Sequence, residues 1–383
     1  MAVAVAATKR KRTLTDNPAT SLSVAAAALA LVSGHCVAQT QPGEGMVAVK
    51  YLDYLDSQPG ADRVRVKARS VMAIVPVSQD WSFAATHTVD AISGASPAYH
   101  TTALSKLTDL RSAQDLSVTR FFTNGTFAAG VSFSREADYL SRASSLQMTH
   151  LSEDRNTTWN AGVSHTSDVV DPVNRAVKGE RKRVNDFLVG WTRVATPNDL
   201  VQVNLGKSYG QGYFSDPYKV FDNRPTTRNS TTLLARWNHH LEETQSTVRL
   251  GYRWFGDNWG VRAHTATLEW VQPLPGAWTV SPSVRLYSQK KADFYLDADT
   301  TGSPFPPNPP DDALVFSQDQ RLSSFGAVTL GFKVSRQLGS GWTADVKLER
   351  YAQRSRWYAG GDGSPGLVPF NARSVQVGLT KSF

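Results

Sequence analysis

Basic side chains that recur at alternate positions are the residues of this 383-residue chain with the clearest chemical potential. Residues 63–69 read RVRVKAR, and in a β-strand this period of two places every basic side chain on one face. The acidic residues predicted to share that face are fewer, chiefly Asp186, Glu269, Asp345 and Glu349. The basic residues are Arg63, Arg65, Lys67, Arg69, Arg236, Arg249, Arg253, Arg285 and Lys347.

A basic face of this kind attracts anions. Arg and Lys side chains gathered on one wall raise the local concentration of phosphates and carboxylates. One hypothesis is therefore a passage or a binding site for a negatively charged solute. The alternative is that Arg–carboxylate pairs brace the structure, while other basic residues hold the phosphates of a membrane lipid.

Two loops are similar to ligand loops but lack essential parts. Residues 297–302 read DADTTG, the first half of a calcium loop, yet Asn308 stands at the twelfth position, where such a loop needs Glu. Residues 360–366 are rich in glycine, but no helix and no Lys-Ser/Thr pair follow, as a phosphate loop requires. We therefore expect polar turns here, with no metal and no cofactor.

Nothing in the sequence selects a catalytic residue. His239 and His240 are adjacent on an expected strand, so they face opposite sides and cannot chelate one ion together. G-x-S-x-G is absent, and no motif picks out a Ser–His or Asp–His pair. We therefore expect a protein that is not an enzyme.

The N-terminus has the composition of an export signal. Residues 9–12 are basic, residues 22–32 are apolar, and Cys36 and Ala38 are small residues placed for cleavage before Gln39. We expect a signal peptide over residues 1–38 and a short periplasmic segment over residues 39–45. Cleavage removes the only cysteine, and the net charge falls from +8 to +5 because four basic residues and one acidic residue leave. Export also argues against a nucleic-acid partner.

From residue 46 onward the chain alternates apolar and polar residues in segments of about ten. Residues 22–32 form its only continuous apolar run, too short for a membrane helix of about 20 residues. We therefore predict an all-β fold over residues 46–383, an antiparallel transmembrane barrel of about 16 strands. The expected strands are 46–56, 62–75, 81–92, 114–122, 126–137, 142–152, 157–167, 184–194, 200–209, 229–240, 245–255, 260–271, 278–290, 319–336, 342–352 and 371–383.

The connections alternate between short turns and long polar loops, which is typical of outer-membrane barrels and not of a soluble β-sandwich. Short turns and both termini are then periplasmic, and the long loops are external. The basic residues named above face the lumen, which residues 291–318 or 93–113 could constrict. The long loops are expected at 93–113, 168–183, 210–228, 291–318 and 353–370.

Aromatic residues support a membrane location. The ten tryptophans fall near the expected strand ends, as in the two aromatic belts of a membrane protein. Phe383 ends the last strand in phase with Leu379 and resembles the signal that the barrel-assembly machinery recognises. The belt near the short turns is predicted to hold Trp81, Trp159, Trp191, Trp237, Trp270, Trp278 and Trp342, and the other belt Trp254, Trp259 and Trp357.

Several stretches resemble a family of Gram-negative outer-membrane barrel proteins known only as a domain of unknown function. The stretches are 92–97, 138–141, 216–219, 257–260 with 264–265, 272–274, 287–289 with 292–295, and 325–327. Genes of that family often lie beside those for a flavin transferase that attaches FMN to exported proteins, a small lipoprotein and a thioredoxin-like protein. The resemblance thus implies a role in envelope flavin or redox biology, and it carries over no catalytic residue.

Together these patterns predict a porin-like barrel, exported into the outer membrane of a Gram-negative bacterium. The leading hypothesis is a channel or transport component for a small or anionic solute in a flavin- or redox-linked pathway. The alternative is a non-conducting scaffold that docks a lipoprotein or a flavinylated partner, and a third, less favoured hypothesis is an outer-membrane enzyme. The expected surroundings are outer-membrane lipid, lipopolysaccharide and the barrel-assembly machinery.

Overall fold

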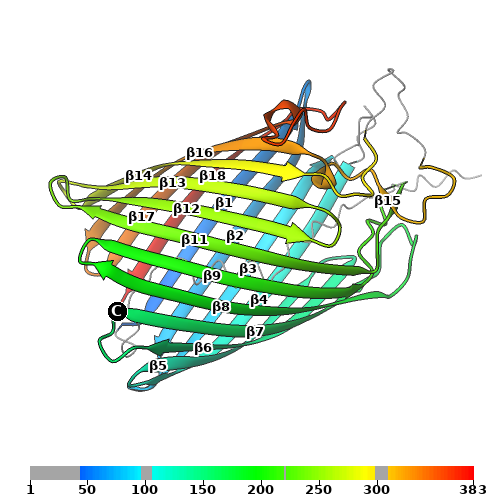
Figure 1. Cartoon of the computed structure of the whole chain (residues 1–383). Coiled ribbons are helices and arrows are strands. Elements are labelled where there is room, and N and C mark those ends of the chain that lie inside the picture. The colour runs from blue at the N-terminus through cyan, green and yellow to red at the C-terminus, as the bar shows by residue number, and fades with distance from the viewer. Residues whose placement is uncertain (1–43, 96–105, 220, 298–308) are drawn as a thin grey trace, which may run out of the picture.

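The computed structural model describes residues 44–95, 106–219, 221–297 and 309–383. They form a closed antiparallel barrel of 16 strands (Figure 1). The strands are β1 (Met46–Gln58), β2 (Ala61–Pro76), β3 (Trp81–Ala95), β4 (Lys106–Phe122), β5 (Gly125–Arg135), β6 (Tyr139–Leu151), β7 (Thr157–Val170), β8 (Glu180–Thr196), β9 (Asp199–Gly212), β11 (Thr227–Leu241), β12 (Ser246–Asp257), β13 (Arg262–Leu274), β14 (Trp278–Lys290), β16 (Phe325–Gly339), β17 (Trp342–Arg354) and β18 (Phe370–Ser382).

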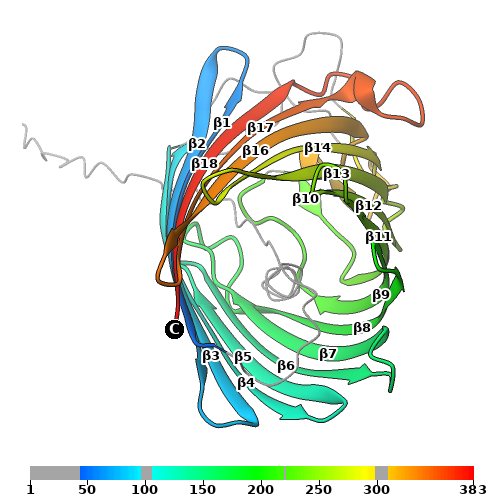
Figure 2. The ribbon, with the colours of Figure 1, turned by 90° about the vertical axis from the view of Figure 1, so that its left-hand side faces the viewer.

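Each strand pairs with the next along the chain, and β1 closes the ring by pairing with β18 from Met46↔Ser382 to Ser57↔Asn371. The view along the axis shows the ring and the lumen inside it (Figure 2). A small sheet of β10 (Asp222–Asn223) and β15 (Phe316–Ser317) lies apart from the barrel wall. Among the described residues, no helix is long and apolar enough to cross a membrane.

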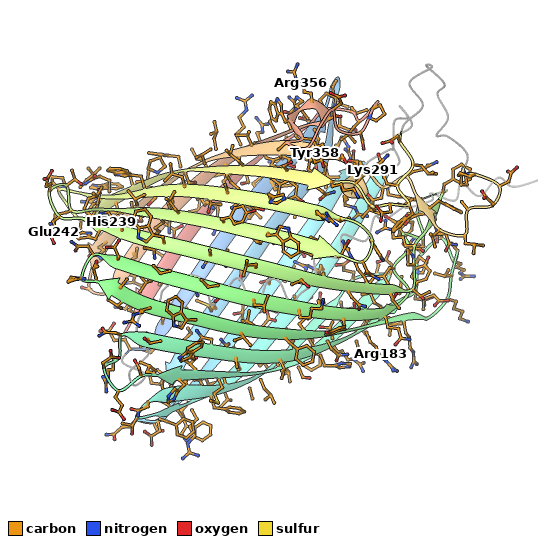
Figure 3. The ribbon with its side chains drawn as sticks, in the orientation of Figure 1. Arg183, His239, Glu242, Lys291, Arg356 and Tyr358 are labelled. Carbon is orange, nitrogen blue, oxygen red and sulfur yellow. The ribbon has the colours of Figure 1, made fainter. Side chains whose placement is uncertain are left out.

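All turns at one end of the barrel are short, whereas the long loops lie at the other end together with a few short connections such as the one between Gln58 and Ala61. In Figure 3 His239 and Glu242 mark the short-turn end, whereas Arg183, Lys291 and Arg356 mark the opposite end. The C-terminus lies at the short-turn end (Figure 1). The predicted barrel and its sorting of turns and loops are therefore confirmed, and we call the two ends periplasmic and external.

Two predicted segments differ from the structure. β3 continues to Ala95 and β4 begins at Lys106, so most of the predicted loop over residues 93–113 is strand, and residues 96–105 lie outside the described part. The strand predicted over 319–336 begins only at Phe325, because a 3-10 helix, η2 (Gln320–Leu322), precedes it. The Asp319 side chain caps that helix by accepting a hydrogen bond from the Arg321 N–H.

The outward face follows from cross-strand neighbours, which lie on the same face of a sheet. Val49 on β1 pairs with Val71 on β2 and with Leu379 on β18. All three are more than 40% exposed, at 48%, 47% and 42%. The other face carries hydrogen-bonded polar groups, for example Thr88 Oγ1, which donates to Ser70 Oγ at 3.0 Å. The apolar face therefore points to lipid and the polar face encloses the lumen.

The long loops fold together into what we call the external layer, the described residues of 213–226, 258–261, 291–297 and 309–324. Its apolar centre is Trp259, 2% exposed, which packs against Val261, Ala292 and Leu322. The Trp259 Nε1–H also donates to the Thr227 carbonyl at 2.8 Å. Because these residues come from two loops and the start of β11, the cluster holds the loops in one arrangement.

Ion pairs connect the same loops. The Arg224 guanidinium contacts Asp222 at 2.9 Å and Asp319 at 2.7 Å, joining the β9–β11 loop to the segment before β16. Arg321 pairs with Asp319 and reaches Asp216 at 3.2 Å. The three carboxylates are almost fully buried, at 0%, 2% and 4% side-chain exposure for Asp222, Asp319 and Asp216.

Candidate functional site: a basic wall of the lumen

Basic side chains from five strands line one hollow of the lumen. Alternation turns these side chains inward, because their strand neighbours, such as Trp237 beside Arg236 and Phe332 beside Lys333, face lipid. The hollow lies on the wall formed by β11, β12, β13, β14, β16 and β17. Its charged lining residues are Arg236, Arg249, Arg285, Lys333, Lys347, Glu269 and Glu349.

The hollow carries an excess of positive charge. Arg249 pairs with Glu269 at 3.1 Å and Lys347 pairs with Glu349 at 2.9 Å. Arg236, Arg285 and Lys333 make no ion pair with any described residue. Five cations against two carboxylates leave a net charge of +3 on this wall. The same residues therefore show both predicted arrangements, paired bracing and cations available to a solute.

Two lumen carboxylates outside the hollow make no ion pair. Asp115 lies on β4, eight places from β13 in the closed ring and hence across the lumen (Figure 2), and it accepts a hydrogen bond from Ser132. Asp186 lies on β8, only two places from β11, and it accepts a hydrogen bond from Ser164 at 3.2 Å. Within the described chain neither carboxylate meets a cation within 4 Å. The charge of the lumen wall is therefore uneven, with the unpaired cations of the hollow on one side and unpaired carboxylates on β4 and β8.

Nearer the external end, three lumen cations are paired. Arg111 contacts Asp90 at 2.9 Å, and Lys182 contacts Asp168 at 3.0 Å. A third pair joins Arg228 to Asp257 at 2.8 Å. Bracing thus describes much of the external part of the lumen wall, although Arg63 and Arg253 there make no ion pair with any described residue.

The structure contradicts the lumen placement of Arg65, Lys67 and Arg69. Register pairs Arg69 with Tyr51, and Tyr51 in turn with Val377, an outward residue that is 46% exposed. These three basic side chains are therefore on the lipid side. Aliphatic residues were expected outside, but on this part of β2 they face the lumen.

The other predicted lumen residues do face inward. Arg253 and Asp345 follow the alternation of their strands. The same holds for Arg236, Arg249, Arg285, Lys347, Asp186, Glu269 and Glu349. Arg63 is 3% exposed at the external rim, and its guanidinium lies 5.6 Å from the centroid of the Phe370 ring. Lys333 was missed, although its place between Phe332 and Val334 carries the same alternating signal.

The seven tryptophans predicted for the belt at the periplasmic end lie on the outward face. Basic side chains cover three of them: Arg120 over Trp81, Arg336 over Trp278 and Lys381 over Trp342, at 4.9–5.7 Å from the ring centroids. The remaining members are Trp159, Trp191, Trp237 and Trp270.

The external belt is thinner than predicted. Trp254 faces outward from β12, and Trp357 is 39% exposed after β17. Trp259 is not in a belt, because it is buried in the external layer. Phe383 lies next to Gly45 at the periplasmic end, and its backbone N–H donates to the Gly45 carbonyl at 2.9 Å.

The structure gives no support to the suggested calcium loop or to a metal site at the histidines. Lys291 donates a hydrogen bond to Asp297, the first residue of the suggested calcium loop, and residues 298–308 lie outside the described part. Among the described side chains no group of three or more His, Cys, Asp or Glu is placed to hold a metal ion. His239 contacts Asp199 at 2.8 Å, whereas His240 points the other way, toward Thr247.

Solved structures share this fold at low sequence identity. A bacterial polysaccharide outer membrane secretin superposes with a TM-score of 0.54 and 8% identity, over 88% of this chain and 98% of that one. OccK2 (OpdF) from Pseudomonas aeruginosa, in complex with glucuronate, gives 0.47 and 10%, over 89% and 98%. The CymD monoaromatic hydrocarbon channel gives 0.43 and 10%, over 90% of each chain. At these identities the likeness shows the fold alone, an outer-membrane β-barrel.

No curated protein matches the chain. A family model does: the family described as Protein of unknown function (DUF3570) matches residues 103–372, which is most of the sequence. This outer-membrane β-barrel therefore belongs to that family.

Proposed function

We propose that this barrel is a channel for small anionic solutes. A barrel of 16 strands is wide enough for an aqueous lumen. The observation that carries the proposal is the net charge of +3 on the lumen wall, where Arg236, Arg285 and Lys333 have no carboxylate partner among the described residues. Rings or walls of Arg and Lys favour anions in a pore by raising their local concentration.

Coulomb's law gives the size of the effect. A monovalent anion about 7 Å from each of three unpaired cations gains about 2 kcal/mol in water. At physiological ionic strength, screening over a Debye length of about 8 Å reduces this to below about 1 kcal/mol. We therefore expect an anion preference of about threefold at physiological salt, rising toward twentyfold at low salt.

Reversal potentials in planar bilayers under a KCl gradient test the proposal. The variant Arg285→Gln/Lys333→Gln should lose most of the anion preference, because two of the three unpaired cations of the hollow are gone. The control Lys67→Gln/Arg69→Gln removes the same charge from the lipid side and should leave the preference unchanged. An unchanged reversal potential in the lumen variant, or a cation preference in the wild type, contradicts the proposal.

The external layer favours a second candidate, a closed barrel that acts as a scaffold. In the view along the axis β10 lies within the ring of strands, and in the side view β15 lies beyond their external ends (Figures 1 and 2). A layer that covers the mouth would block conduction and leave the periplasmic end to dock a lipoprotein or a flavinylated protein. The absence of any single-channel conductance, together with co-purification of a flavin-bearing partner, would favour the scaffold.

A link to an envelope flavin or redox pathway is part of the proposal for either candidate. Its support is the resemblance of the sequence to proteins encoded beside a flavin transferase. Flavin fluorescence of a partner captured from membranes would identify that pathway, and partners without flavin would separate the barrel from it.

A further inference from the structure

The outward wall of β17, β18, β1 and β2 carries a compact patch of cations near the external end. These four strands are consecutive in the ring (Figure 2). Arg350 pairs directly across from Arg373, and Arg373 in turn lies across from Leu55, which pairs with Arg65. Lys67 and Arg69 continue the patch along β2. Cross-strand partners share a face, so all five cations point outward.

Little negative charge of the protein's own balances this patch. Asp53 accepts two hydrogen bonds from Arg65, at 3.0 and 2.5 Å. Lys67, Arg69, Arg350 and Arg373 make no ion pair within the described part of the chain. Like charges directly opposite on neighbouring strands destabilise a sheet. The pair Arg350 and Arg373 therefore needs an anion from outside the protein to compensate its repulsion.

An apolar surface lies directly beside the patch, on its periplasmic side. On β18 Arg373 is followed at alternate positions by Val375 and Val377, which are 43% and 46% exposed. On β2 Arg69 is followed by Val71, 47% exposed. The same strands thus present cations and then aliphatic side chains to whatever lies outside the barrel. A ligand that fits both has a negatively charged head and an apolar tail.

We propose that this patch binds the phosphorylated headgroup of an outer-leaflet glycolipid, with its acyl chains lying along the valines. Phosphate groups accept charge-assisted hydrogen bonds from Arg in the fork geometry that Arg350 and Arg373 present side by side. Because the patch lies near the external end, it faces the outer leaflet of the membrane, where phosphorylated glycolipid supplies the anions. The inference does not rest on the proposed channel, because the patch faces away from the lumen.

Native mass spectrometry of the detergent-solubilised barrel, with lipid A added in EDTA, tests this site. Bisphosphorylated lipid A should bind the wild type, and Arg350→Gln/Arg373→Gln should weaken that binding at least about tenfold, the loss expected when charged hydrogen-bond donors are removed. Arg350→Lys/Arg373→Lys should keep most of it. The control Arg236→Gln/Arg285→Gln removes the same charge from the lumen and should bind like the wild type.

Two further arms identify the ligand. Dephosphorylated lipid A should bind the wild type no better than it binds the Gln variant, and millimolar inorganic phosphate should not displace lipid A, because it has no acyl chains. Heat-modifiable mobility on a denaturing gel verifies that each variant is folded. Binding within twofold of the wild type in a folded Gln variant overturns the proposal, and so does an equal loss in the lumen control.

Discussion

Replacing Arg224 with Met should loosen the external layer while leaving the barrel intact. The Arg224 side chain is only 10% exposed and lies between Asp222 and Asp319. Asp319 keeps a second partner in Arg321, with Nε–Oδ2 at 2.7 Å. Asp222 does not, and its remaining contacts are the Ser317 side chain and the backbone N–H of Asp216 at 2.5 Å. The substitution therefore leaves one buried carboxylate without its counter-charge.

Two estimates limit the free-energy cost of the Arg224→Met substitution. Removing one partner of a buried ion pair destabilises by about 3–5 kcal/mol. Asp222 can escape this cost by binding a proton, which at pH 7 costs a carboxyl with an unfolded pKa near 3.9 about 4 kcal/mol. We therefore expect the layer to lose about 3–4 kcal/mol, which raises its opening equilibrium about 100- to 700-fold.

Amide hydrogen exchange of residues 213–219 and 309–324, compared as protection factors, measures this opening. Arg356→Met is the control, because Arg356 is an exposed arginine of another external loop (Figure 3). The transmembrane strands should keep their protection in both variants. A change below about fivefold in the layer, or equal loss of protection in the strands, would refute the reasoning, because a 3 kcal/mol cost predicts a far larger and local effect.

The destabilisation of the external layer by Arg224→Met should also depend on pH. Burial raises the pKa of Asp222 even with Arg224 beside it, and in the variant the guanidinium no longer opposes that rise. A carboxyl whose folded pKa exceeds its unfolded pKa destabilises as pH rises, so the variant should recover up to about 2.7 kcal/mol between pH 7 and pH 5.

The wild type should change less over the same range, because Arg224 opposes the rise in the pKa of Asp222. Burial alone would raise the pKa of Asp319, but the positive charges of Arg321, Lys219 and Arg224 outweigh it and hold the pKa well below its usual value. The stability that Asp319 contributes is therefore complete above about pH 4 and is lost only as pH falls toward the depressed pKa. A variant whose defect is the same at pH 5 and pH 7 would show that Asp222 is not the cause.

Three further predictions concern other parts of the chain. Trp259→Ala should destabilise the external layer by about 3–5 kcal/mol, measured as increased proteolysis of its loops, whereas Trp81→Ala, at an exposed position, should not. Deleting Phe383 should slow insertion into the outer membrane without changing the stability of molecules already folded, which pulse-labelling and heat-modifiable gels can separate. Mass spectrometry of the protein purified from outer membranes should give a mature chain that begins at Gln39, and an N-terminus upstream of it would disprove the predicted cleavage.

The fold was predictable because a lipid-facing wall imposes a strong and repeated constraint. Each strand shows period two, and each turn between strands at the periplasmic end is short, so apart from the starts of β4 and β16 the strand bounds differ from those expected by at most four residues. The segment 319–324 reads DQRLSS and has one apolar residue, Leu322, so its own pattern does not separate a strand from a loop. Only contacts from distant loops, such as the pairing of Asp319 with Arg224, hold it in a capped turn instead of a strand.

Trp259 shows why the candidate site was harder to predict than the fold. A tryptophan just beyond the end of a strand has the same local sequence whether it meets the membrane interface or a packed loop. The environment of Trp259 is decided by its packing against Ala292 and Leu322, which belong to two other segments of the external layer. Those contacts span more than 30 residues and leave no periodic signal in the sequence.

The wrong face predicted for Arg65, Lys67 and Arg69 has a different cause, because the residues that show the correct face lie in the same strand. Alternation states which side chains share a face, but not which face is outside. β2 pairs with β3 from Val64 to Pro76 without a register shift, so the basic residues and Val71 must lie on one face.

The choice of face must therefore be made from the part of the strand that lies among acyl chains, where a buried cation is most costly and an apolar side chain is required. On β2 that part contains Val71 and Val75, which are 47% and 40% exposed. The basic residues lie closer to the external end, where charged headgroups stabilise cations on the outer surface. One strand can thus show valines inside at one end and outside at the other without breaking its period, and only the hydrocarbon level fixes the direction.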